Sequence, residues 1–214
     1  MNLWKESTKL LFVLEVIGTI AFAISGALVA VEKKMDLFGV AMLGMTTAVG
    51  GGIFRDLLLG GTPPSALRNP IYAIISIVVS LVIFISSIRS LLYSNKRIYD
   101  VIMLIMDSIG LGVFTVIGVQ AANTLDGGYN VFLAAFVGVI TGVGGGIVRD
   151  LFAGETPKIL IKHFYACASL IGALAYIVLW NYTKNEQGMI VGASVTVVLR
   201  IFAAHYRWGL PKAE

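Results

Sequence analysis

Long apolar runs, separated by short polar connections, make up most of the chain. Seven of them are long enough, or nearly so, to cross a hydrocarbon core of about 30 Å, which takes about 20 helical residues. The runs are continuous and do not alternate between polar and apolar residues, so they predict membrane helices and not the strands of a barrel. The expected spans are Leu10–Val31, Leu37–Leu59, Ile71–Leu92, Tyr99–Ala122, Val131–Phe152, Phe164–Trp180 and Gly188–Tyr206.

The composition fits a chain that lies almost wholly in a bilayer. Of its 214 residues, 57% are hydrophobic and 13% are charged, whereas about 25% are charged in an average soluble domain. We therefore expect residues 1–214 to form a single membrane domain in the cell membrane, with membrane lipids as partners. The net charge is +4, but the basic residues lie in short clusters between apolar runs. Nucleic acid is not expected as a partner, because no basic patch with interleaved aromatic residues is present.

The distribution of basic residues predicts the orientation, because the cytoplasmic side should carry the excess of Lys and Arg. One side carries Lys33, Lys34, Arg89, Lys96, Arg97, Lys158, Lys162, Arg207 and Lys212, and the other carries Lys5, Lys9, Arg68 and Lys184. This difference predicts that the N-terminus lies outside and the C-terminus lies in the cytoplasm.

The chain contains an internal repeat. The segment 50–63 matches the segment 144–157 at ten of fourteen positions, and the similarity extends upstream into the preceding spans. The expected repeats cover 10–92 and 99–180, and a seventh helix over 188–206 follows them. Each copy holds three spans, an odd number, so the second copy enters the membrane from the opposite face. Inverted repeats are typical of transport proteins whose sites lie at the repeat interface near the middle of the membrane.

Each copy carries three consecutive glycines inside a predicted span. Each glycine costs about 1 kcal/mol relative to alanine in a helix, so we expect the second and fifth helices to be broken there. The carbonyl groups freed by a break could coordinate a cation, with help from a nearby threonine hydroxyl. Alternatively, the glycines only allow close helix contacts, and the hydroxyls only bond to backbone carbonyls. The candidate pore residues are Gly50, Gly51, Gly52, Gly144, Gly145, Gly146, Thr47 and Thr141.

An arginine and an aspartate follow each glycine triplet. Ionisable residues in membrane spans are rare, costly and usually functional. Because neighbours in sequence do not face each other on a helix, we expect the two halves to exchange partners, so that each arginine pairs with the aspartate of the other half. In the alternative, all four residues lie near helix ends, where each arginine snorkels to the interface and each aspartate caps a half-helix. The candidate charge network is Arg55, Asp56, Arg149, Asp150, Glu15 and Asp107.

Several phrases of the sequence resemble those of prokaryotic TRIC (trimeric intracellular cation) channels, which are also labelled as glycine transporters. They are Phe22–Gly26, Met35–Gly39, Gly50–Gly52 with Arg55–Gly60, and Gly144–Gly146 with Arg149–Asp150. The resemblance implies a homotrimer in which every seven-helix subunit has its own hourglass pore for monovalent cations, chiefly potassium and also sodium. It further implies that the second and fifth helices line that pore.

Two function classes remain open. An inverted repeat suits both a channel and a secondary transporter of glycine or another small solute, and the resemblance favours the channel. An enzyme is not expected, because the sequence offers no nucleophile with a base and no metal-ligand cluster. No cofactor is expected either, apart from the permeant K⁺ or Na⁺.

Overall fold

The computed structural model describes residues 3–85, 95–124, 130–161, 164–180, 182 and 185–209. The regular secondary structure in these ranges is helical. The long helices are α1 (Leu3–Glu32), α2 (Leu37–Leu58), α4 (Ile71–Phe84), α6 (Lys96–Asn123), α7 (Val131–Phe152), α9 (Tyr165–Trp180) and α10 (Asn185–His205). Two single-turn helices, α3 (Ser65–Arg68) and α8 (Lys158–Ile161), follow α2 and α7.

The predicted spans match the long helices closely. The fifth predicted span coincides with α7, and the others begin or end within a few residues of a helix, except that α1 starts seven residues earlier than expected. The end of the third span, over residues 86–92, lies outside the described residues. Within the described ranges, five helices are long and apolar enough to cross a membrane, and α4 and α9 are shorter apolar helices. The chain is thus an all-helical membrane protein.

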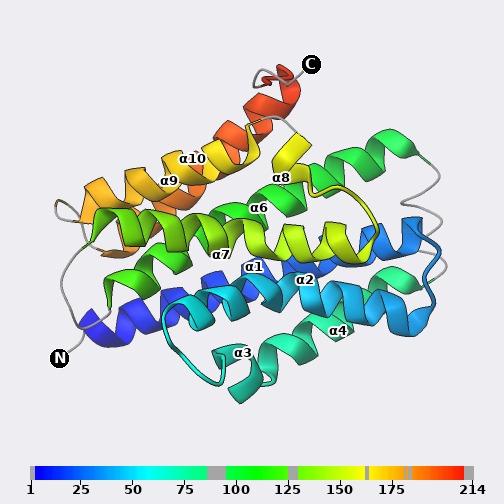
Figure 1. Cartoon of the computed structure of the whole chain (residues 1–214), viewed down its shortest axis with the longest axis horizontal. Coiled ribbons are helices and arrows are strands. Elements are labelled where there is room, and N and C mark those ends of the chain that lie inside the picture. The colour runs from blue at the N-terminus through cyan, green and yellow to red at the C-terminus, as the bar shows by residue number, and fades with distance from the viewer. Residues whose placement is uncertain are drawn as a thin grey trace.

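The two halves of the chain pack face to face, and the helices of each half lie together. In the first half α1 packs on α2 and α4, and in the second α6 packs on α7 and α9, with α10 against α6 and α9. Contacts of α2 with α7 and of α1 with α6 join the halves. The two termini lie at opposite ends of the bundle, and α1 and α6 run in opposite directions (Figure 1).

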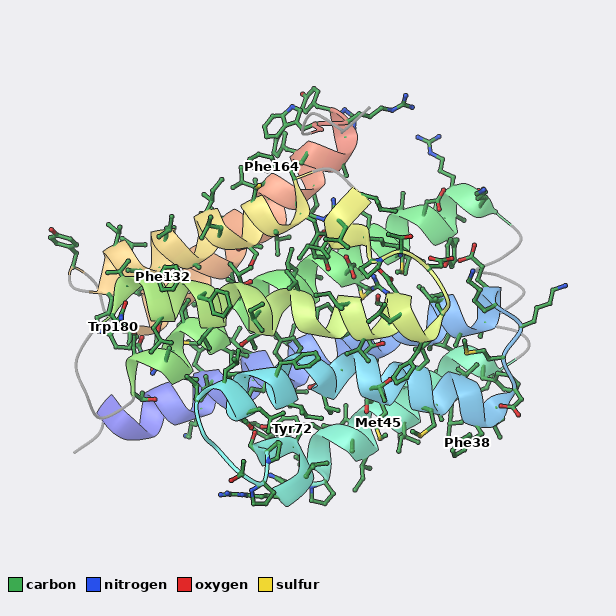
Figure 2. The ribbon with its side chains drawn as sticks, in the orientation of Figure 1. Phe38, Met45, Tyr72, Phe132, Phe164 and Trp180 are labelled. Carbon is green, nitrogen blue, oxygen red and sulfur yellow. The ribbon has the colours of Figure 1, made fainter. Side chains whose placement is uncertain are left out.

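Two exposed phenylalanines make the opposite directions of the halves visible. Phe38 and Phe132 occupy equivalent positions of the repeat, each near the start of its helix, α2 or α7. Figure 2 shows them at opposite ends of the bundle. Both side chains are largely exposed. An apolar outer surface of this kind would be costly in water, and it suits contact with lipid.

The predicted helix breaks at the glycine triplets are wrong. Both α2 and α7 run through their triplets as continuous helices. A Cβ atom added at Gly51 would lie 2.1 Å from the backbone oxygen of Thr141, and one at Gly145 would lie 2.2 Å from that of Thr47. The glycines therefore bring the two helices into backbone contact, as small residues do in membrane bundles. This close approach offsets their low helix propensity and leaves the helical hydrogen bonds intact.

Alanine substitutions should separate the contact glycines from their neighbours. In Gly51→Ala or Gly145→Ala the new methyl group meets backbone that cannot move aside, so we expect a loss of about 1–3 kcal/mol of stability. Gly52 is the matched control, because the nearest atom to an added Cβ is the end of the Arg55 side chain, at 4.0 Å. Gly52→Ala should be neutral or stabilising by up to about 1 kcal/mol. Thermal unfolding in detergent would measure the stability of all three variants. Equal stabilities would contradict the close backbone contact at Gly51 and Gly145.

Candidate functional site

The same turn follows α2 and α7, and it explains the glycine that ends each repeated motif. Gly60 has φ of +75° and Gly154 has φ of +70°, a left-handed conformation that glycine adopts without the strain of a Cβ atom. In both copies the residue after this glycine donates its N–H to the carbonyl of the motif's aspartate, at 2.7 Å from Gly61 and 2.9 Å from Glu155. This six-to-one hydrogen bond is the Schellman motif of helix ends.

The motif's aspartates connect each helix to the segment that follows it. The Oδ2 atom of Asp56 accepts a hydrogen bond from the backbone N–H of Ser65 at 2.6 Å, and Oδ2 of Asp150 accepts one from Lys158 at 2.7 Å. Ser65 and Lys158 are the first residues of α3 and α8. Each carboxylate therefore caps the short helix that follows, and not a half of a broken span as the alternative interpretation expected.

The predicted exchange of partners between the halves is wrong, because each arginine pairs with its own neighbour. The Nε atom of Arg55 donates to Oδ1 of Asp56 at 2.8 Å, and that of Arg149 donates to Oδ1 of Asp150 at 2.9 Å. The rule that sequence neighbours point apart holds for short side chains. The arginine side chain is long enough to fold back beside the next residue and reach its carboxylate.

Arg149 forms the centre of a fully buried ionic cluster in the second half. Its side chain is inaccessible to solvent, and Nη1 lies 2.5 Å from Oδ1 of Asp107 on α6. The same nitrogen donates to the hydroxyl of Ser25 on α1. Two carboxylates and a hydroxyl thus surround one guanidinium, which is the arrangement that makes a buried charge tolerable. The cluster ties α7 to helices of both halves.

The equivalent cluster in the first half is more open and has different partners. Glu15 occupies the position equivalent to Asp107, and it accepts a hydrogen bond from the hydroxyl of Tyr72 and not from an arginine. Arg55 pairs with Asp56, and their side chains are 11% and 13% exposed. Tyr72 lies at the start of α4, on the face of the bundle opposite α9 and α10 (Figure 2). The repeat therefore places similar charges in two unlike environments.

Two cavities border these clusters. The smaller, of about 40 Å³, is lined by Glu15, Thr19, Gly52, Arg55, Tyr72 and Phe114 among others. The larger cavity has a volume of about 580 Å³. It is lined by residues from the end of α1, the first half of α6, the segment after α7, and α10. They include Glu32, Asp107, Glu155, Lys158 and Arg200. Along α1 the smaller cavity touches Glu15 and the larger one Glu32, so the cavities lie at different depths of the bundle.

The sequence-predicted site residues fall into three places. Glu15, Gly52 and Arg55 line the smaller cavity and Asp107 the larger one. Gly50, Gly51, Gly144 and Gly145 form the α2–α7 contact, and Gly146 faces the Tyr165 hydroxyl. The hydroxyls of Thr47 and Thr141 donate to the carbonyls of Leu43 and Val137 in their own helices, each at 2.6 Å. With continuous helices, the free carbonyls expected for ion binding are not formed.

Sequence reasoning missed two residues of the larger cluster. Arg200 on α10 is 6% exposed, and its guanidinium carbon lies 4.7 Å from the centroid of the Tyr165 ring. The signal for Arg200 was present, since it is a charged residue inside the seventh apolar run. Tyr165 has a weaker signal, because it is equivalent to Tyr72 only when the repeat alignment continues past the shared motif with a shift of one residue.

An ion pair joins the two halves at the mouth of the larger cavity. Lys33, in the turn after α1, lies 2.7 Å from Glu155, in the turn after α7. The hydrogen bond from Lys33 holds the pKa of the Glu155 carboxyl below its usual value, although partial burial works in the opposite direction. Both side chains are more than a third exposed. Such an exposed pair contributes little stability, so it can break and re-form.

These features define a multi-pass helical membrane protein made of two similar halves, with charged cavities at different depths. The sequence model of the family described as Glycine transporter matches residues 12–87 and 104–181, two stretches that fall within the two halves. The chain belongs to this family. It is 37% identical over 205 residues to the UPF0126 inner membrane protein YadS of Escherichia coli K12, covering 94% of this chain and 95% of that protein.

Solved structures of TRIC cation channels have the same fold. One, from a study of conductance, is 41% identical with a TM-score of 0.81, covering 94% of this chain and 96% of that one. The TRIC trimeric intracellular cation channel orthologue from Rhodobacter sphaeroides is 33% identical with a TM-score of 0.83, covering 92% and 98%. The resemblance to prokaryotic TRIC channels is confirmed.

Removing either arginine should test how differently the two halves use the same motif. Arg149→Ala leaves Asp107 buried without its cation and Asp150 with only the ammonium group of Lys158, 4.0 Å away, so we expect a loss of about 3–5 kcal/mol. Arg55→Ala should cost less than half as much, because Asp56 is partly exposed and keeps its bonds from Ser65. Thermal unfolding of the two purified variants provides the comparison. Equal losses would mean that burial does not distinguish the clusters.

Proposed function

We propose that this protein is a homotrimeric channel for monovalent cations, chiefly K⁺ and also Na⁺, with one pathway in each subunit. The pathway runs through the interface of two inverted three-helix repeats, beside α2 and α7, and α10 is the seventh span. The observation that carries the proposal is the pair of cavities at different depths of the bundle. The similarity to solved TRIC cation channels supports it.

A short apolar barrier separates the two cavities. Phe22 and Phe114 are equivalent residues of the repeat, and their rings stack with centroids 5.3 Å apart. Phe114 lines the smaller cavity. On α1, Phe22 lies between Glu15 at the smaller cavity and Ser25 in the Arg149 cluster. Apolar constrictions of this kind stop ion flow by excluding water, so this conformation corresponds to a closed pathway.

The pairing of Arg55 and Arg149 with carboxylates reduces the repulsion of cations by these two residues. A free guanidinium beside the pathway would repel K⁺ and Na⁺. Arg55 and Arg149 both have carboxylate partners within 2.9 Å, so their charges are largely compensated. The first-half cluster, with Glu15 and Asp56 against Arg55, carries one excess negative charge, which attracts cations into the smaller cavity.

Removing the barrier should increase ion flow. In Phe114→Ala the stacked pair is lost, and we expect the open probability in planar bilayers to rise severalfold with K⁺ and Na⁺ as charge carriers. Phe38→Ala is the control, because Phe38 is 73% exposed on the outer surface, and it should behave as wild type. Native mass spectrometry should give a trimer for every variant. If the wild-type protein gives no unitary currents but takes up labelled glycine in proteoliposomes, the result would favour a secondary transporter.

The orientation can be tested separately. We expect seven crossings, including α4 and α9, with the N-terminus outside and the C-terminus in the cytoplasm, because the basic residues accumulate at the ends that would face the cytoplasm. Reporter fusions at the two termini should therefore give opposite signals. If both reporters gave the same signal, an odd number of spans and the inverted repeat would both be ruled out.

A further inference from the structure

Each half of the repeat contains the same three polar groups: a carboxylate on its first long helix, an arginine on its second and a tyrosine at the start of its third. The three residues are Glu15, Arg55 and Tyr72 in the first half and Asp107, Arg149 and Tyr165 in the second. The tyrosines correspond after a shift of one residue. The same shift relates Ser65 to Lys158, whose N–H groups bind the two motif aspartates in the same way. The repeat therefore holds two copies of one carboxylate–arginine–tyrosine triad.

The two triads differ in the partner of the carboxylate. In the second half Asp107 binds Arg149 at 2.5 Å. In the first half Glu15 accepts a hydrogen bond from the hydroxyl of Tyr72, and within the described residues no ion pair joins it to Arg55. Each half thus shows one of two possible pairings of the same three groups.

The length of the acidic side chain does not explain this difference. Glutamate is one methylene longer than aspartate, so Glu15 has at least the reach of Asp107. Glu15 and Arg55 line the same cavity of about 40 Å³, a space for about three water molecules. A rotation of the Glu15 side chain across this small space would bring its carboxylate to the guanidinium.

Arg55 also keeps a donor available for Glu15. Its Nε and Nη2 atoms bind Asp56 and Ser65, whereas Nη1 has no partner in the described part of the chain. The corresponding Nη1 atom of Arg149 is the one that binds the carboxylate in the second half. The second pairing is therefore open to the first half as well.

The tyrosine of the second half shows the other side of this choice. A Cβ atom added at Gly146 would lie 3.1 Å from the Tyr165 hydroxyl and 4.0 Å from Oδ1 of Asp107, so the hydroxyl and the carboxylate are neighbours. The hydroxyl is nevertheless buried without a hydrogen-bond partner among the described residues. A carboxylate that binds the arginine therefore leaves the tyrosine unused, although an unpaired buried hydroxyl is costly.

The local charge explains which pairing each half adopts. In the second half two cations, Arg149 and Lys158, face two carboxylates. In the first half Ser65 replaces the lysine, so a second carboxylate on the arginine would give the cluster a net negative charge. This lowers the attraction between Glu15 and the arginine, and a charge-assisted hydrogen bond from Tyr72 prevails.

The choice of partner coincides with the presence of a cavity between the charged groups. Glu15, Arg55 and Tyr72 all line the smaller cavity. The Arg149 side chain is inaccessible to solvent and does not line the larger cavity, although Asp107 does. Space thus separates the carboxylate from the arginine in the half where the tyrosine holds the carboxylate.

We propose that Tyr72 is a positioning residue that keeps the smaller cavity open. Its hydroxyl holds the Glu15 carboxylate away from Arg55, which leaves the carboxylate available to cations. Without this hydroxyl, Glu15 binds Nη1 of Arg55, as in the second half, and closes the cavity. The inference rests on the proposed function for the role of the cavity in cation entry, whereas the choice of partner can be measured without it.

The reactivity of a thiol in the smaller cavity tests this choice. Cys167, the single cysteine of the sequence, is replaced by alanine. Gly52→Cys then adds a thiol to the cavity wall, where the nearest atom to an added Cβ lies 4.0 Å away. Methyl methanethiosulfonate, a small neutral reagent, reacts with the purified full-length protein at fixed pH. Tyr72→Phe should lower the reaction rate severalfold, because the new ion pair fills the space beside the thiol.

Two further variants separate the ion pair from a general disturbance. In a Glu15→Gln background, Tyr72→Phe should leave the rate unchanged, because the amide has no charge to attract Arg55. Tyr165→Phe is the matched control. It removes the equivalent hydroxyl, which has no partner, and should not alter the rate at Gly52→Cys. Loss of structure cannot imitate the expected result, since an unfolded chain reacts faster.

A Tyr72→Phe rate equal to or above that of the parent would overturn the proposal. So would a lower rate that persists with Glu15→Gln, because the carboxylate would then not be the group that closes the cavity. These rates need no current. A wild-type protein without unitary currents would contradict the channel function and leave the positioning role of Tyr72 to be decided by the thiol.

Discussion

The backbone contact between α2 and α7 is the constraint on which the rest of the structure depends. At this crossing Gly51 and Gly145 each approach a threonine carbonyl of the other helix. In a bilayer, where lipid is as apolar as leucine, helices associate through close packing and hydrogen bonds. A larger side chain at the crossing would move the two halves apart and displace the aromatic pair and the ionic clusters beside it.

The ionic clusters show how one motif can take two roles. In both halves the aspartate fixes its own arginine and caps the helix that follows. The difference arises from the surroundings, because Asp107 reaches Arg149 whereas Glu15 is held by Tyr72. The charged side chains of the second-half cluster are therefore buried, whereas those of Arg55 and Asp56 are partly exposed. Both halves carry the motif, and differences at a few neighbouring positions give each copy its own environment.

Much of the fold could be predicted from the sequence, because span length and the repeated motif are strong signals. The span Val131–Phe152 was located to the residue, and the helix boundaries elsewhere differ by a few positions. The state of the glycine triplets could not be predicted, because low helix propensity permits a break or a close contact. Only the position of the opposing helix decides between them. The pairing of Arg149 likewise depended on Asp107, 42 residues away, and on the reach of a flexible side chain.

The glycine crossing has a mechanical consequence. The segment of α2 after the crossing leads to Arg55 and the smaller cavity, and the segment of α7 after it leads to Arg149 and the larger cavity. The two helices run in opposite directions, so these segments lie on either side of one point of contact. A small change in the crossing angle about that point would therefore displace Arg55 at the smaller cavity and Arg149, which binds Asp107 at the larger one, at the same time.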